Sequence, residues 1–229
     1  MNRTLKWPLC WLALALCSLP ATAQILYSNL GTGTDVYNCC QGWTISGTGT
    51  LGVSFTAANE FQVTNSGSPG QIDVAVGYVT GVDSFYLNID ADNGGKPGAV
   101  LASFSNLSSS TNYGDCCGLI SISGIAGLSL STGTNYWMVL GPTDSGSTAW
   151  GAWNFSNSAG GLDEYSTDGG KGWINNGTQP QGAFDILAGC ATGKNSPDCG
   201  PPTPEPSSIV LLGSGILALA GLLRGKLKL

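Results

Sequence analysis

Apolar and polar residues alternate along most of the chain. Between Gln24 and Leu187, apolar positions recur at every second residue, as in residues 72–78 and 85–89. This period is typical of strands with one buried face, whereas the fully apolar run 136–140 predicts a strand buried on both faces. The same region contains no amphipathic helical stretch of useful length.

Turn signals rich in glycine and asparagine separate these segments. They are Asn65-Ser66-Gly67, Asp92-Asn93-Gly94-Gly95, Ser131-Thr132-Gly133, Asp168-Gly169-Gly170 and Asn175-Asn176-Gly177. About a dozen short strands joined by such turns predict an all-β domain over residues 24–187, an antiparallel β-sandwich of jelly-roll type.

The N-terminal end has the order of a signal peptide. Arg3 and Lys6 precede an apolar stretch, and the small residues Ala21 and Ala23 follow it. A positive region, an apolar core and a small-residue cleavage site are the three parts of a secretory signal. We therefore expect signal peptidase to remove residues 1–23 and the mature protein to begin at Gln24.

The C-terminal end predicts a membrane helix. Residues 188–206 form a linker rich in glycine and proline that ends in Pro204, Glu205 and Pro206. Residues 207–229 follow, with an apolar run that is just long enough to span a bilayer and a basic end. The positive-inside rule places that basic end in the cytoplasm and the preceding domain outside.

This C-terminal order resembles the PEP-CTERM sorting signal of exported bacterial proteins. The resemblance implies a membrane-anchored precursor that an exosortase-type protease cuts near the Pro-Glu-Pro motif, so that the product reaches the cell surface or the extracellular space. It covers the tail alone. An ordinary C-terminal membrane anchor with a proline-rich stalk is the alternative.

Several phrases in the body resemble the choice-of-anchor R domain, a group of exported bacterial domains. They are the segments 42–47, 93–98, 133–137, 150–154 and 182–186, which occur in this order. The resemblance implies an extracellular or surface β-domain. No catalytic residue can be assigned from this resemblance.

The mature segment is strongly acidic. Five of the eight lysines and arginines lie in the two predicted targeting ends. The mature segment therefore keeps three cations, Lys96, Lys171 and Lys194, and all 14 acids, which gives it a net charge of −11. A nucleic-acid ligand needs clustered lysine and arginine, so no nucleic-acid partner is expected. Divalent cations, neutral glycans and other matrix components stay open as partners.

The chain contains no histidine. This excludes hydrolases that use an imidazole base and the usual catalytic zinc and iron centres. A glycosidase would need two carboxyl groups about 5 to 10 Å apart, and the sequence singles out no such pair. We therefore expect no catalytic residue, no metal and no cofactor.

Six cysteines remain after removal of the predicted signal peptide. They are the adjacent pairs Cys39-Cys40 and Cys116-Cys117, followed by Cys190 and Cys199. An even number in an exported chain indicates disulfides. We expect the last two to pair locally and the adjacent pairs to be joined to each other, because a bridge between sequence neighbours strains the intervening peptide. A zinc site is the alternative, although four-thiolate sites usually show Cys-x-x-Cys spacing.

Two acidic turns resemble known motifs. Residues 90–95 resemble the start of a calcium loop but lack the later ligands of an EF-hand, so we expect a hairpin turn with solvated carboxylates. Residues 166–173 fit the Asp-box pattern Ser-x-Asp-x-Gly-x-x-Trp. That resemblance implies a structural hairpin whose aspartate bonds turn amides while its tryptophan packs beneath.

One aromatic segment is the candidate glycan-binding surface. Its rings are Trp150, Trp153, Tyr165 and Trp173, and its hydrogen-bonding side chains are Asn154, Asn157, Asp163 and Glu164. Aromatic faces cover the C–H faces of sugars, so we expect any small ligand here and not at the turn after Asp90. Core packing is the alternative for the indole rings. Trp150 and Trp153 have opposite parity and would face opposite sides of a regular strand.

These patterns favour an exported protein of the cell surface or extracellular matrix. We expect a non-enzymatic adhesive or structural role, with extracellular polysaccharide as the partner. The alternatives are a carbohydrate-binding module and a glycoside-active enzyme that uses a carboxylate pair. A defined glycan on an array would indicate the module, whereas an adhesin would show little affinity for soluble sugars.

Overall fold

The computed structural model describes residues 24–189, which form an all-β structure. The strands are β1 (Ile25–Ser28), β2 (Asn38–Ser46), β3 (Thr56–Gln62), β4 (Pro69–Val74), β5 (Val76–Thr80), β6 (Phe85–Asp92), β7 (Pro97–Leu107), β8 (Thr111–Asn112), β9 (Ile120–Ser123), β10 (Asn135–Pro142), β11 (Trp150–Ser166), β12 (Ile174–Gly182) and β13 (Phe184–Ala188). A single helical turn, α2 (Thr48–Leu51), is the one helix of this segment. The predicted all-β class is confirmed.

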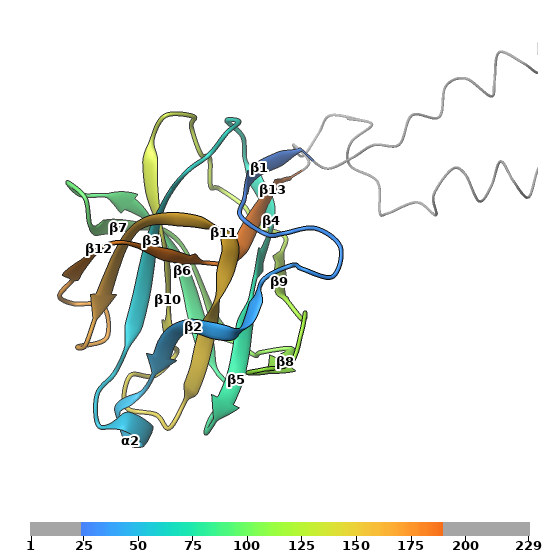
Figure 1. The fold of residues 1–229 in the computed structure, drawn as a ribbon. Coiled ribbons are helices and arrows are strands. Elements are labelled where there is room, and N and C mark those ends of the chain that lie inside the picture. The colour runs from blue at the N-terminus through green and yellow to red at the C-terminus, as the bar shows by residue number, and fades with distance from the viewer. Residues whose placement is uncertain (1–23, 190–229) are drawn as a thin grey trace, which may run out of the picture. The chain divides into compact units, whose positions relative to one another are not determined.

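The strands form two sheets. One has the order β1-β13-β4-β9, and the other follows the path β7-β6-β10-β3-β11-β5-β8, with β2 and β12 also paired to β11 (Figure 1). Nearly all pairs are antiparallel, but β5 and β8 pair in parallel over two positions. The larger sheet is therefore mixed, which corrects the prediction of a purely antiparallel fold.

Strand β11 connects the two halves of the larger sheet. Its N-terminal half lies between β2 and β5, and its C-terminal half lies between β3 and β12. At 17 residues it is the longest strand described. Sharing one long strand makes the two halves a single sheet.

Side chains from both sheets fill one hydrophobic core. The smaller sheet contributes Leu26, Ile72, Val74, Ile120, Ile122, Phe184 and Ile186, and the larger sheet contributes Ile45, Phe61, Phe85, Leu87, Ile89, Met138, Leu140 and Trp153. The two inner faces therefore pack against each other as in a sandwich. Burial of this apolar surface is the main force that holds the sheets together.

Strand β10 is buried on both faces, as its apolar run predicts. Met138 and Leu140 enter the main core, while Trp137 and Val139 face the other way. There they form a second, smaller cluster with Ala58. The outer face of the larger sheet is thus covered in this region.

Two local predictions from the sequence are wrong. The alternating stretch 72–78 is not one strand, because the chain crosses at Ala75 from β4 in the smaller sheet to β5 in the larger. The expected turn at Asn175–Gly177 lies inside β12, where the register shifts opposite Asp163 and Glu164. Gly177 takes a φ of 72° there. A left-handed glycine serves a β-bulge as readily as a turn, which explains the ambiguous signal.

The β-domain extends slightly past its predicted end. Strand β13 includes Ala188, and the amide of Gly189 donates to the carbonyl of Ser68 at 2.7 Å. The predicted signal peptide with Ala21 and Ala23, the cysteines Cys190 and Cys199, the motif at 204–206 and the helix at 207–229 lie outside the described residues. Between residues 24 and 189, no helix has the length and apolar character that a bilayer crossing requires.

Candidate functional site

The Asp-box segment is an ordered hairpin between β11 and β12. The Asp168 Oδ1 accepts hydrogen bonds from the amides of Lys171 (3.0 Å) and Gly172 (2.9 Å), and the Ser166 hydroxyl donates to it at 2.7 Å. These hydrogen bonds lower the pKa of Asp168, and the bond from Ser166 has the largest effect. The predicted structural role of the aspartate is confirmed.

Trp173 closes this hairpin and packs against the smaller cluster. It contacts the group formed by Ala58, Trp137 and Val139, together with Tyr86 of β6. A Cβ placed on Gly170 would lie 3.3 Å from the Tyr86 hydroxyl and 3.9 Å from the Trp173 ring. The two rings therefore approach the same glycine.

A surface hollow of about 400 Å³ lies beside these rings, over β6 and β7, and we call it the β6–β7 hollow. Its lining residues are Tyr86, Asn88, Asp90, Gly98, Val100, Ser103, Ser105, Val139, Thr143, Gly169, Gly170 and Trp173. Strand alternation explains this composition. Phe85, Leu87 and Ile89 point into the core, so the residues between them must point outward.

The strand register completes the hollow. Asn88 pairs with Ser103 of β7, and Asp90 pairs with Val100. Directly opposite residues of an antiparallel pair share a face, so the Ser103 hydroxyl lies beside the Asn88 amide and the Val100 side chain lies beside the Asp90 carboxylate. Hydrogen-bonding groups and aromatic rings therefore line one surface.

Two oxygens in the hollow lack a protein partner. The Asn88 Oδ1 and the Asp90 Oδ1 are buried atoms without a hydrogen bond. Asp90 is only 4% exposed, and burial raises its pKa to about 6. The expectation of a solvated carboxylate at Asp90 is wrong, because Trp137 and Val100 flank it on the neighbouring strands.

The turn after Asp90 is the hairpin expected from its sequence. The Asp92 carboxylate accepts the amides of Gly94 (3.2 Å) and Gly95 (3.0 Å). The same carboxylate accepts the Trp137 indole N–H at 2.9 Å. Asp92 thus holds the turn and is not a free ligand.

The structure separates the four aromatic residues of the predicted sugar-binding surface. Trp153 is fully buried in the main core, where its indole N–H donates to the carbonyl of Ala183 at 3.3 Å. Trp150 and Tyr165 are half-buried on β11 and do not line the hollow. Only Trp173 does, and it shares the hollow with Asp90.

The hydrogen-bonding residues of that segment are used internally. Asn154 donates to the carbonyl of Asn38, Asn157 donates to Asp35, Asp163 accepts from Asn59 and Asn176, and Glu164 accepts from Asn175. Burial raises the pKa of Asp163 to about 6. These side chains hold β11 to its neighbours.

Sequence reasoning missed Tyr86, Asn88, Ser103 and Ser105. Alternation along residues 85–92 could have predicted part of the hollow, because its outward positions are Tyr86, Asn88, Asp90 and Asp92. Ser103 and Ser105 could not be predicted in this way, because only the register of β6 with β7 brings them to the hollow.

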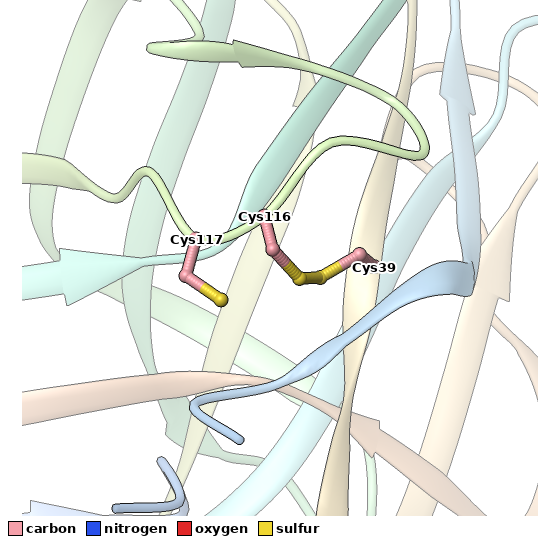
Figure 2. Close-up of side chains that lie close together, drawn as sticks. All are labelled: Cys39, Cys116 and Cys117. Carbon is pink, nitrogen blue, oxygen red and sulfur yellow. A yellow bond between two sulfur atoms is a disulfide. The ribbon is translucent and has the colours of Figure 1, made fainter. Parts of the chain in front are cut away.

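One disulfide joins the two adjacent cysteine pairs. Cys39 is bridged to Cys116 with their Cα atoms 5.6 Å apart, and Figure 2 shows the Cys117 sulfur beside the bridge. The predicted link between the pairs is confirmed for this bridge, which fits an oxidising environment. Cys40 and Cys117 are free, so the prediction that these two cysteines also form disulfides is wrong. Strand alternation explains why only one bridge forms, because Cys39 is buried on β2 while Cys40 is exposed.

The three sulfurs of Cys39, Cys116 and Cys117 lie within 4.8 Å of one another. A zinc site would need several thiolates as ligands. Because the bridge uses two of these sulfurs, the arrangement leaves one thiol at this position and does not fit the zinc alternative.

A second group of acids lies on the smaller sheet. Asp73 of β4 and Asp185 of β13 are directly opposite each other, and each has a buried Oδ1 without a hydrogen-bond donor. Gln71 donates to the other oxygen of Asp73 at 2.7 Å. Burial, and then the neighbouring Asp73 carboxylate, raise the pKa of Asp185 to about 7.

Comparison with known proteins assigns no family to the chain, since no protein-family model and no curated protein matches it.

Proposed function

We propose that this protein binds extracellular polysaccharide through the β6–β7 hollow and serves a non-enzymatic adhesive role. One observation carries the proposal: buried acceptor oxygens without partners lie beside two aromatic rings in an open hollow. The Asn88 and Asp90 side chains have acceptor oxygens without a protein donor, and sugar hydroxyls are donors that suit such groups. The Tyr86 and Trp173 rings supply the apolar contact that sugar C–H faces require.

The size and position of the hollow support this proposal. Its volume of about 400 Å³ falls in the range of small-molecule sites, roughly 300 to 1,000 Å³. Most of its polar side chains come from β6 and β7, so paired strands hold them in place. A site on rigid strands loses less entropy on binding than a site on loops.

We further propose that the protein is exported and sorted as its ends predict. Removal of residues 1–23 and processing near Pro204–Pro206 by an exosortase-type protease would place the domain at the cell surface. The Cys39–Cys116 bridge supports an oxidising compartment. We likewise propose that the domain is related to choice-of-anchor R domains. We also propose that its strands have jelly-roll connectivity.

A glycan array and isothermal titration calorimetry with the purified exported protein test the binding function. Ser103 is exposed in the hollow, so Ser103→Tyr fills the space without disturbing the core. We expect this variant to lose binding. The matched control is Ser123→Tyr, at an exposed position of β9 in the other sheet, which should bind normally. Equal binding by both variants, or no glycan bound by the parent protein, would refute the proposal.

A further inference from the structure

The Asp90 carboxylate has an unusual electrostatic environment. Its Oδ1 is buried and has no hydrogen-bond partner, and Trp137 and Val100 lie beside it on the adjacent strands. Burial of a charge without a compensating partner is unfavourable. The raised pKa of about 6 still leaves most of this carboxyl group charged at neutral pH.

Residues 24–189 supply no cation to this carboxylate. No residue that lines the β6–β7 hollow is a lysine or an arginine. Between residues 24 and 189 the chain has only two cationic side chains, Lys96 and Lys171, and both are exposed. A cation that pairs with this carboxylate would therefore have to come from outside the domain.

The chemistry of the hollow narrows the choice of ligand. A neutral hydroxyl can donate to Asp90 but leaves its charge uncompensated, whereas an ammonium group supplies both a donor and a charge. Tyr86 and Trp173 line the same hollow, and aromatic faces attract ammonium groups. A divalent cation would need six or more oxygen ligands, but Asp90 is the only acid in the lining.

Building on the proposed glycan-binding function, we infer that the β6–β7 hollow selects polysaccharides that carry free amino groups, with Asp90 pairing with the ammonium of an amino sugar. Asn88, Ser103 and Ser105 then contact the neighbouring hydroxyls. The acidic surface of the domain favours the approach of such a polycation.

Three oligosaccharides test this selectivity. β-linked oligomers of glucosamine, N-acetylglucosamine and glucose share one backbone and differ only at carbon 2, where they carry an ammonium, an acetamide and a hydroxyl. We expect calorimetry of the exported protein at near-neutral pH to show at least about tenfold tighter binding of the glucosamine oligomer, because a close charge pair replaces a neutral contact. Asp90→Asn should reduce that affinity to the level of the neutral oligomers.

A matched control separates the hollow from general surface charge. Asp115 is an exposed acid outside the hollow, so Asp115→Asn removes one negative charge, as Asp90→Asn does, and should keep the preference. If both variants keep it, the preference comes from the whole surface and the inference is wrong. Equal affinity for all three oligomers also overturns it but leaves the proposed function standing, whereas failure of the whole glycan array overturns both. Melting temperatures of both variants, compared with the parent, show that each is folded.

Discussion

Replacement of Asp185 by Asn should stabilise the protein at alkaline pH. Asp185 and Asp73 oppose each other on β13 and β4, and burial together with the Asp73 charge raises the pKa of Asp185 to about 7. The folded state therefore holds a proton that the unfolded state releases. Such a group favours folding at low pH, and its contribution is lost as the pH rises from about 4 to about 7.

The pKa difference sets the size of the effect. The ordinary pKa of an aspartate is about 3.9, and a pKa difference of one corresponds to about 1.4 kcal/mol, so the upper limit is about 4 kcal/mol. Asp185 is only partly shielded from solvent, and we expect about half of this limit, ~2 kcal/mol. An asparagine adds no charge, and its amide can donate to the free oxygen of Asp73.

Thermal unfolding at several pH values measures this effect. Near pH 8 the Asp185→Asn variant should melt roughly 4 to 8 °C above the parent protein, and near pH 4 the two should agree within error. The control is Asp115→Asn, at an exposed position, which should follow the parent at every pH. Asp90 and Asp163 also have a raised pKa, so the variant should flatten only part of the pH profile. Identical melting of variant and parent near pH 8 would refute the electrostatic argument.

Three further predictions concern the core and the processing of the chain. Trp153→Ala should lower the free energy of unfolding by about 3 to 5 kcal/mol in denaturant titrations, because it removes a fully buried indole; a loss below ~1 kcal/mol would contradict its place in the core. Non-reducing peptide mapping should recover the Cys39–Cys116 bridge, and a thiol reagent should label exposed Cys40 in the folded protein; any other pairing of Cys39 would contradict the structure. Intact-mass analysis of protein from its host should show a product without residues 209–229, and a mass that includes them would exclude the proposed processing.

Local patterns were enough to predict much of the fold. The apolar run of β10 indicated a strand buried on both faces, and the alternation in β6 indicated its inward side chains. The Asp-box spacing predicted a hairpin whose serine and aspartate hold the turn. In each case neighbouring residues along the chain determine the structure, so the sequence alone carries the information.

Long-range pairing explains what was missed. Nothing near Ser103 in the sequence indicates that it lies opposite Asn88, and the alternation through Ala75 continues unbroken although the chain changes sheets there. The aromatic segment looked like one surface because its rings are close in sequence. The bulged path of β11 and β12 and the burial of Trp153 separate them. The candidate site therefore depends on register, which a single sequence does not specify.

The pairing of the terminal strands has a mechanical consequence. Strand β13, the last of the domain, is not an edge strand, since it lies between β1 and β4 with antiparallel partners on both sides. A pulling force that enters from the C-terminal end acts along β13, so the hydrogen bonds of both ladders are loaded in shear and must break together rather than one after another. A domain held at a surface by its C-terminal end would therefore resist being torn open by flow.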